Sequence, residues 1–392
     1  NNEEAIKQLH LETNTDTLIA GEALEIYWDS RGQFPIQNVE LVLSDNENPL
    51  STKAYGAKKI TLLNDRVIKL TANICGKNFE SAVPVQVSTP QKQKPSDINS
   101  LSLGAQNDLW AGGTNGDLIK FDRIKNKWSK ISGVRVGIKT KDQTINDATP
   151  ITSVLEMKGD CENDVYFGTQ GGFLYRSHDG GKTVSGLNDG AYAVQFFTSD
   201  VTNPFDNPSP INFVASDPDN PASIYVGHSA GLVHFKDCHD PAADKADYLF
   251  PHKNVLASAN ADDAFNVLLD GNIHQIDSLK HWEILDTGDE TVNWITNGLN
   301  HLFFGTDNHV SEYAAPHHQM VWDHEGNTLT QTENILFIGS PNGLYFKRNN
   351  GSSWMKVSGL DSPIKKLLPN QDENILWILT NQGDVYKLEG LL

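Results

Sequence analysis

One short pattern of residues recurs seven times along this chain. Its clearest copy, residues 333–354, has the apolar run Leu336–Ile338, the pair Asn342-Gly343 and a second apolar run, Leu344–Phe346. An Asn-Gly pair between two apolar runs predicts a β-hairpin, because glycine adopts the positive φ that a tight hairpin turn requires. The equivalent turn positions in the seven copies are Gly116, Gly172, Gly231, Gly271, His309, Gly343 and Gly383.

Successive copies are spaced by 56, 59, 40, 38, 34 and 40 residues. Short strands that repeat at about 40 residues are typical of a β-propeller, in which one repeat forms one blade and cannot bury both faces alone. We therefore expect an all-β chain with a seven-bladed β-propeller over residues 97–392. The two long spacings indicate insertions, Val134–Pro150 and Thr198–Pro210. The expected inner strands are Ile98–Leu103, Ile151–Met157, Ile211–Ala215, Val255–Ala259, Val292–Thr296, Thr328–Gln331 and Ile364–Pro369.

The seventh repeat reaches Leu392 without a closing strand. Because closure of the ring removes exposed sheet edges, we expect a segment from elsewhere to pair with this repeat. The candidates are the segment just before Asp97 and one from the N-terminal region. In four other repeats the closing strand carries a tryptophan that is expected to pack between neighbouring blades. These residues are Trp128, Trp282, Trp322 and Trp354.

Two motifs in the repeats resemble known propellers. The pattern W-x-G-T-x-x-G-L-Y, in residues 107–122, 163–177 and 334–347, is similar to repeats in sensor regions of bacterial two-component regulators. Residues 177–183 resemble the Asp-box of sialidases, sortilin-type receptors and photosystem assembly-factor propellers, and residues 348–354 are a degenerate second copy. The resemblance implies a fold rather than an activity, because Asp-boxes stabilise hairpin turns. It implies structural roles for the motif residues Ser177, Asp179, Gly181 and Thr183.

Residues 1–87 form a separate predicted unit. Apolar and polar residues alternate after Gly21 and again over Val67–Ile74 and Ala82–Val87, and a hairpin is expected around Lys77-Asn78. This ending resembles the last two strands of bacterial immunoglobulin-like domains, which implies a β-sandwich with Trp28 in its core. Residues 88–96 have the polar and proline-rich composition of a linker.

Charge is unevenly distributed along the chain. Residues 97–392 hold 38 acidic and 21 basic side chains, and the total net charge is −19. Nucleic acid and anionic membrane surfaces are therefore not expected as partners, since both require a basic face. Residues 183–235 and 281–346 contain no lysine or arginine. Blades three to six are therefore expected to carry either an acidic docking surface or cation site, or a solvated acidic exterior. No apolar run of 18 residues predicts membrane insertion. The start at Asn1 resembles a processed N-terminus, so an extracytoplasmic location, periplasmic, envelope-associated or secreted, is expected.

Three cysteines allow one disulfide. Cys161 precedes the second hairpin, and Cys238 follows the third, so a bridge between them is sterically feasible and would leave Cys75 free. In an oxidising compartment this bridge would join two blades. The alternative is that both thiols are reduced and separate.

The sequence contains no recognisable catalytic constellation. Motifs for nucleophile elbows, zinc proteases and phosphate-binding loops are absent, and the arginine setting of sialidases is missing. No cofactor is expected. Twelve of the thirteen histidines lie between His178 and His324, and Cys238-His239-Asp240 offers three metal-ligand types in one loop. Scattered surface histidines are the simpler interpretation.

These observations favour a non-enzymatic binding or scaffold protein of a bacterial envelope or secreted assembly. Protein is the expected partner, with glycan as the second choice. The insertions are the expected contact regions, because a blade core needs no such length. The contact candidates are Phe196, Phe197, Phe205 and Asp206. The alternative is a glycan-active enzyme, such as a glycoside hydrolase, sialidase-like enzyme or lyase, or a glycan-binding module that uses the propeller funnel.

Overall fold

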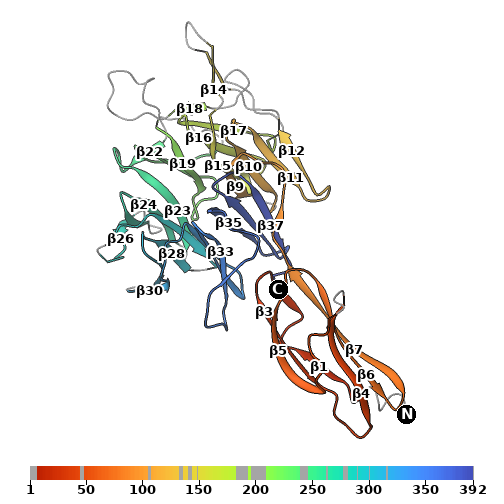
Figure 1. The fold of residues 1–392 in the computed structure, drawn as a ribbon. Helices are drawn as coiled ribbons and strands as arrows, with labels where there is room; N and C mark the ends of the chain where they lie inside the picture. The colour runs from red at the N-terminus through yellow and green to blue at the C-terminus, as the bar shows by residue number, and fades with distance from the viewer. Residues whose placement is uncertain are drawn as a thin grey trace.

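The chain folds into an elongated N-terminal part and a larger ring-like part, as the computed structural model shows (Figure 1). The structure describes residues 7–44, 48–104, 107–131, 136–139, 144–147, 149–181, 193–195, 209–238, 246–261, 264–276, 281–288, 290–299, 301–314 and 317–391. Nearly all regular structure in these residues is β-strand, which confirms the all-β prediction. A short 3-10 turn, η1 (Gly159–Cys161), is an exception. No helix among the described residues is long and apolar enough to cross a bilayer.

The N-terminal part consists of two sheets that share one core. One sheet contains β1 (His10–Thr13), β3 (Ala23–Asp29) and β5 (Tyr55–Thr61), and the other contains β2 (Thr17–Ile19), β7 (Lys77–Ser88), β6 (Arg66–Ile74) and β4 (Ile36–Leu43). Trp28 is buried in this core, and its Nε1 donates to the Lys53 carbonyl at 2.9 Å. The β6–β7 turn consists of Cys75 and Gly76 rather than Lys77-Asn78. Both turn residues have positive φ, and the strands therefore pair up to Ile74–Lys77.

Seven four-stranded antiparallel sheets follow within the described residues, and we number them sheet 1 to sheet 7 in chain order. Sheet 1 contains β9 (Ile98–Leu103), β10 (Leu109–Gly113), β11 (Leu118–Asp122) and β12 (Lys127–Ile131). Sheet 2 contains β15 (Ile151–Glu156), β16 (Val165–Thr169), β17 (Phe173–Ser177) and β18 (Ala193–Gln195). Sheet 3 contains β19 (Ile211–Ser216), β20 (Ile224–His228), β21 (Gly231–Phe235) and β22 (Ala246–Leu249). Sheet 4 contains β23 (Val255–Ala261), β24 (Ala264–Leu269), β25 (Asn272–Ile276) and β26 (Trp282–Ile284).

The remaining three sheets complete the ring. Sheet 5 contains β27 (Trp294–Gly298), β28 (His301–Gly305), β29 (Val310–Ala314) and β30 (His317–Trp322). Sheet 6 contains β31 (Thr328–Gln331), β32 (Ile335–Ser340), β33 (Gly343–Arg348) and β34 (Met355–Lys356). Sheet 7 contains β35 (Ile364–Asn370), β36 (Ile375–Thr380), β37 (Val385–Glu389) and β8 (Gln91–Lys92). The expected inner strands therefore match β9, β15, β19, β23, β27, β31 and β35 to within two residues at each end.

Sheet 7 takes its fourth strand from the segment before Asp97, within the predicted linker. β8 pairs with β37, with Lys92 opposite Tyr386 and Gln91 opposite Lys387. The Lys92 ammonium also contacts Asp384 at 2.7 Å. This pairing is one of the two closures that the sequence predicted, and it joins the two ends of the ring-like part.

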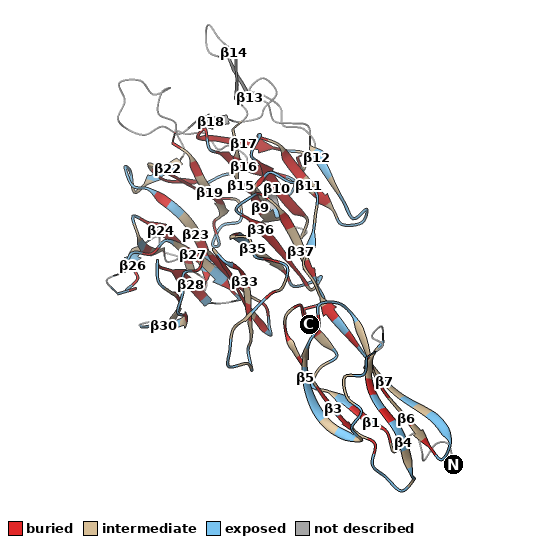
Figure 2. Ribbon diagram, viewed as in Figure 1, coloured by how far each residue is buried: buried red, intermediate tan, exposed pale blue. Residues whose placement is uncertain are grey.

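Apolar side chains fill the spaces between neighbouring sheets (Figure 2). The second strand of each sheet is buried along nearly its whole length, as are the third strands of sheets 2 and 3. The tryptophans expected in closing strands lie in these spaces. Trp128 packs edge-on against Trp377 of sheet 7, and Trp322 packs edge-on against Trp354 of sheet 6. Such edge-to-face contacts between large rings stabilise the sheet-to-sheet packing.

The hairpin turn of the clearest repeat differs by one residue from the prediction. Ser340 pairs with Gly343, so Pro341 and Asn342 form the turn and Gly343 begins β33. Gly343 has a φ of 121°, and a Cβ at this position would lie 2.1 Å from the Leu360 carbonyl oxygen. The glycine is therefore required by the close approach of the chain that leaves sheet 6.

One turn of the N-terminal part is inserted into the ring. Ile19 is fully buried within the apolar cluster of sheets 6 and 7, and the Ser358 amide donates to the Ala20 carbonyl at 2.9 Å. The Arg348 guanidinium donates to both carboxylate oxygens of Glu22, at 2.7 and 2.9 Å. This bond raises the pKa of Arg348. Together, the apolar contact and the two-pronged ion pair hold the two parts of the molecule to one another.

We predict that Glu22→Ala weakens this junction by about 1–3 kcal/mol, because it leaves a half-buried guanidinium without its carboxylate. The measurement is calorimetric unfolding together with small-angle scattering, and a lower first transition and a larger radius of gyration are expected. Glu25→Ala is the matched control, since Glu25 forms an exposed pair with Lys59. Equal behaviour of the two variants would refute the prediction.

Candidate functional site

Both predicted insertions connect the last strand of one sheet to the first strand of the next. The first spans residues 132–150, between β12 and β15, and the second spans residues 196–210, between β18 and β19. All inner strands run in the same direction around the ring, so these connections lie on one face. We call it the insertion face. It also carries the β20–β21 turn, residues 229–230.

A hairpin projects from the insertion face. It consists of β13 (Val136–Lys139) and β14 (Thr144–Asp147), which pair in antiparallel register with Val136 opposite Asp147. In Figure 1 this hairpin and the N-terminal part lie at opposite ends of the molecule. The contact candidates Phe196, Phe197, Phe205 and Asp206 lie outside the described residues, as do Thr183 of the turn motif and His239 and Asp240 of the metal candidate.

The second insertion is anchored by a buried polar group. Ser209, at its end, has its hydroxyl 2.8 Å from His228 Nδ1 and 2.9 Å from the Ser229 hydroxyl. The Ser229 amide donates to the Pro210 carbonyl at 3.1 Å, and the Ala230 amide lies 3.3 Å from His228 Nδ1. Ser209 carries no signal in the sequence, because its proximity to His228 depends on how the insertion returns to sheet 3.

Burial lowers the pKa of His228 to about 4. The imidazole is therefore neutral at physiological pH, and Nδ1 is an acceptor for the surrounding donors. Ser209 has no exposed surface. The Ser209–His228 pair consequently orients backbone and holds the insertion, whereas a nucleophilic serine needs access to substrate and a base that takes its proton.

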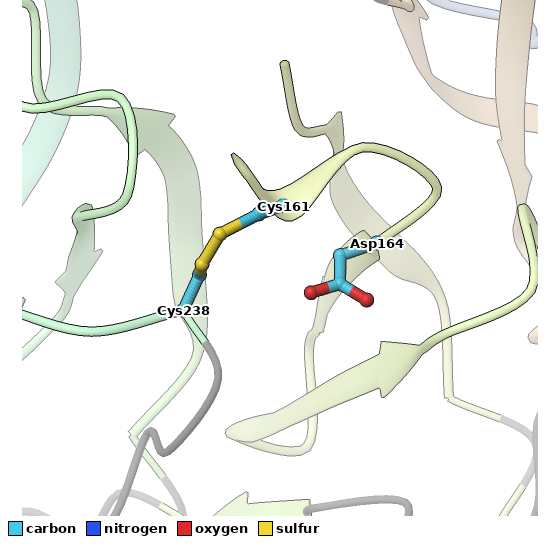
Figure 3. Close-up of side chains that lie close together, drawn as sticks. All are labelled: Cys161, Asp164 and Cys238. Atoms are coloured by element: carbon cyan, nitrogen blue, oxygen red, sulfur yellow. A yellow bond between two sulfur atoms is a disulfide. The ribbon is translucent and has the colours of Figure 1, made fainter. Parts of the chain in front are cut away.

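Cys161 and Cys238 form a disulfide between sheets 2 and 3, with 6.4 Å between their Cα atoms (Figure 3). Both residues are buried, and the Tyr166 hydroxyl donates to the Cys238 carbonyl at 2.6 Å. Cys75 is exposed and free. Asp164 lies beside the bridge, and these three residues are the group of possible metal ligands found among the described residues. In the bridged form neither sulfur is available as a thiolate ligand.

Asp164 is paired on its other side. Arg176 Nη2 donates to its Oδ2 at 2.6 Å, and His178 Nδ1 lies 2.9 Å from its Oδ1. Asp164 and Arg176 are both buried. A buried carboxylate with a guanidinium partner is a compensated charge, so this cluster has the properties of a structural ion pair next to the disulfide.

The turn at residues 177–181 is held by its own side chains. The Ser177 hydroxyl donates to Asp179 Oδ1 at 2.8 Å and accepts from the Gly181 amide at 3.0 Å. Gly180 and Gly181 both have positive φ. A Cβ on Gly181 would lie 2.6 Å from the ring of Trp110, so this turn packs directly against sheet 1. Its residues serve the packing between sheets 1 and 2.

We predict that replacing both bridge cysteines, Cys161→Ser with Cys238→Ser, lowers the free energy of unfolding by about 2–4 kcal/mol, because the bridge restrains a long segment of the unfolded chain. Reductant should destabilise the parent protein and leave this variant unchanged in denaturant titrations. Cys75→Ser is the control and should behave like the parent. Reductant-insensitive stability of the parent would contradict the prediction.

We also predict a pH dependence that comes from His228. Its folded-state pKa lies below that of an unfolded histidine, so the unfolded state binds more protons between about pH 4 and pH 6.5 and stability falls as the pH is lowered through this window. The contribution lost between pH 7 and pH 5 is about 2 kcal/mol. In His228→Gln, the free energy of unfolding should change less with pH between pH 7 and pH 5 than in the parent. His10→Gln, a change at an exposed position, should show the pH dependence of the parent. Identical profiles for the parent and His228→Gln would exclude this role.

Comparison with known proteins identifies the fold. No protein-family model and no curated protein matches the chain. Among solved structures, YCF48 bound to D1 peptide is similar with a TM-score of 0.57 at 12% identity, covering 77% of this chain and 95% of that one. YCF48 from Cyanidioschyzon merolae has a TM-score of 0.55 at 8% identity, with 77% and 99% covered. The β-propeller domain of Cps50 (Swd1) from Myceliophteria thermophila has a TM-score of 0.52 at 12% identity, with 76% and 98% covered. The ring of four-stranded sheets is therefore a β-propeller.

Proposed function

We propose that this chain is a non-enzymatic scaffold protein that binds a protein partner through the insertion face of a seven-bladed propeller. In this proposal sheets 1 to 7 are the blades, and the N-terminal part is an immunoglobulin-like sandwich that holds the propeller in a larger assembly. The resemblance to YCF48 bound to D1 peptide supports a binding role, since that protein of similar fold binds a peptide.

The position of the two insertions carries the proposal. They precede β15 and β19, which are the inner strands of adjacent sheets, so both insertions leave the ring at neighbouring places on one face. A blade core needs neither segment for its packing. The Ser209–His228–Ser229 group fixes the end of the second insertion, which reduces the conformational entropy lost on binding.

The junction with the N-terminal part supports the scaffold role. Ile19 and the Glu22–Arg348 pair give this junction both an apolar and an ionic contact, which favours a fixed geometry over a flexible tether. A fixed junction allows the N-terminal part to be held by one component while the insertion face binds another. The Cys161–Cys238 bridge supports an extracytoplasmic location in a bacterial envelope or secreted setting, because structural disulfides persist in oxidising compartments.

The test is affinity capture from a native envelope extract with the full chain and with a variant in which residues 198–207 are replaced by a short Gly-Ser segment. This variant retains Ser209 and Pro210, so that sheet 3 keeps its anchor. We expect a defined protein set with the parent chain and at least a tenfold loss with the variant, since central contacts dominate binding energies.

Ile124→Ser provides a matched control on the opposite face. Ile124 lies in the β11–β12 turn and is 99% exposed, so the change removes an apolar contact without affecting the core. Its captured proteins should equal those of the parent chain. Loss with Ile124→Ser and retention with the shortened insertion would place the contact on the other face. Glycan arrays and hydrolase assays on the same preparations test the glycan-binding and enzyme alternatives.

A further inference from the structure

The inner strands of the propeller are joined to one another by side chains near their first residues. Sheets 1, 2, 3, 4 and 7 each have a bulge there, with one residue left out of the strand pairing. Asn99 Nδ2 donates to the Ile151 carbonyl of the next sheet at 2.9 Å, and Asn212 Nδ2 donates to the Val255 carbonyl at 2.7 Å. These bonds join sheet 1 to sheet 2 and sheet 3 to sheet 4 beside the central channel that the inner strands of a propeller surround, near the insertion face.

In sheet 7 the bulge residue is a lysine. Lys365 Nζ donates to the Asn99 carbonyl at 2.7 Å and to Asn99 Oδ1 at 2.8 Å, which joins sheet 7 to sheet 1. A lysine ammonium group has three N–H donors, and these two bonds use two of them. The third N–H remains for a ligand. Lys365 thus bonds sheet 7 to sheet 1 and places a positive charge at the end of the channel near the insertion face.

Lys366 follows the bulge, and the residue that it pairs with differs in type from the corresponding residue of sheets 1, 2 and 3. The residue after the bulge faces a glycine in sheets 1, 2 and 3, as in the pairs Ser100–Gly112 and Phe213–Gly227. A Cβ on Gly227 would clash with Phe213, so that side chain lies over its glycine partner. Lys366 instead faces the fully buried Leu379, which occupies the corresponding space.

Lys366 is exposed even though its strand is enclosed on three sides. β35 pairs with β36 on one edge, and the inner strands β31 and β9 pack against its two faces. The remaining open side is the channel axis. This open side is therefore where the exposed Lys366 side chain meets solvent, and the surrounding protein reduces its hydration there. This partial desolvation and the charge of Lys365 lower the pKa of Lys366 to about 8.

The charge of this pair is not matched by acidic residues of the inner strands. Apart from the two lysines, the described inner strands carry one charged residue, Glu156. Glu156 ends β15, whereas the lysines lie near the start of β35, so they lie toward opposite ends of the channel. Its Oε2 already accepts from Trp110 Nε1 at 3.2 Å. Two adjacent ammonium groups that no carboxylate of the other described inner strands faces form an anion-binding arrangement within a chain whose net charge is −19.

We propose that Lys365 and Lys366 form a binding site for a compact anion, a carboxylate or phosphate group, inside the axial channel near the insertion face. The Lys366 ammonium group is the principal hydrogen-bond donor to the anion, and Lys365 adds its third N–H group. The anion is either a free small molecule or the carboxylate terminus of a polypeptide that enters the channel. This site does not depend on the proposed partner contact, since its residues belong to the inner strands and not to the insertions.

The test is site-resolved amine labelling of the intact protein, with the modification of each lysine followed by mass spectrometry. Inorganic phosphate should slow the labelling of Lys366 by about fivefold or more at saturation relative to sodium chloride of equal ionic strength. Lys125, which is 74% exposed and pairs with Asp122, is the internal control and should react at the same rate in both salts.

A pair of short peptides distinguishes the two sources of the anion. Protection by a peptide with a free C-terminus, at concentrations where its amidated form is inactive, assigns the site to a chain terminus. Protection by phosphate without protection by either peptide assigns it to a small molecule. Lys366→Gln should abolish phosphate-induced stabilisation against heat, and Lys366→Arg should retain it. Unchanged Lys366 labelling with phosphate and with both peptides would overturn the proposal.

Discussion

The pairing of β8 with β37 is the contact on which the ring depends. Each sheet exposes two apolar faces, and each face is covered only by a neighbouring sheet, so a ring that failed to close would leave sheet 7 and sheet 1 exposed. Two strand residues, Gln91 and Lys92, provide the fourth strand of sheet 7. Lys365 reinforces the same closure on the axial side through its bonds to Asn99. Closure therefore combines a backbone pairing at the rim with a side-chain bond at the channel.

This closure also determines how the N-terminal part is mounted. β7 runs to Ser88, only three residues before β8, and the Ser88 hydroxyl donates to the Gly390 carbonyl at 2.8 Å. A segment that is both the last strand of one part and the approach to the ring cannot act as a flexible spacer. The insertion of Ile19 into the core between sheets 6 and 7 then adds a second point of attachment. Two separated attachments resist rotation, which a single linker would allow.

The sequence predicted the repeats well because most hairpins consist of two short apolar runs around a turn that contains glycine, and these are local signals. The sequence did not predict the exact turn positions and pairings that depend on contacts between distant segments of the chain. Gly343 begins a strand because Leu360 approaches it, and the β6–β7 turn falls on Cys75-Gly76 because pairing continues to Lys77. The Cys161–Cys238 pairing was open in the sequence, since it needed the distance between two sheets. Lys366 was not singled out at all, because its exposure follows from its neighbour across the strand, Leu379.

The proposed anion site differs in kind from the proposed partner contact on the insertion face. Acidic side chains dominate the propeller, and their repulsion of an approaching anion is screened beyond about 8–10 Å at physiological ionic strength. Inside the channel, hydration is reduced, so the charges of Lys365 and Lys366 act over short distances with less competition from water. A large acidic partner is therefore repelled at the surface, whereas a compact anion that enters the channel meets the two ammonium groups. In the two proposals together, size and charge select the anion of the channel, and the shape of the insertion face selects the protein partner.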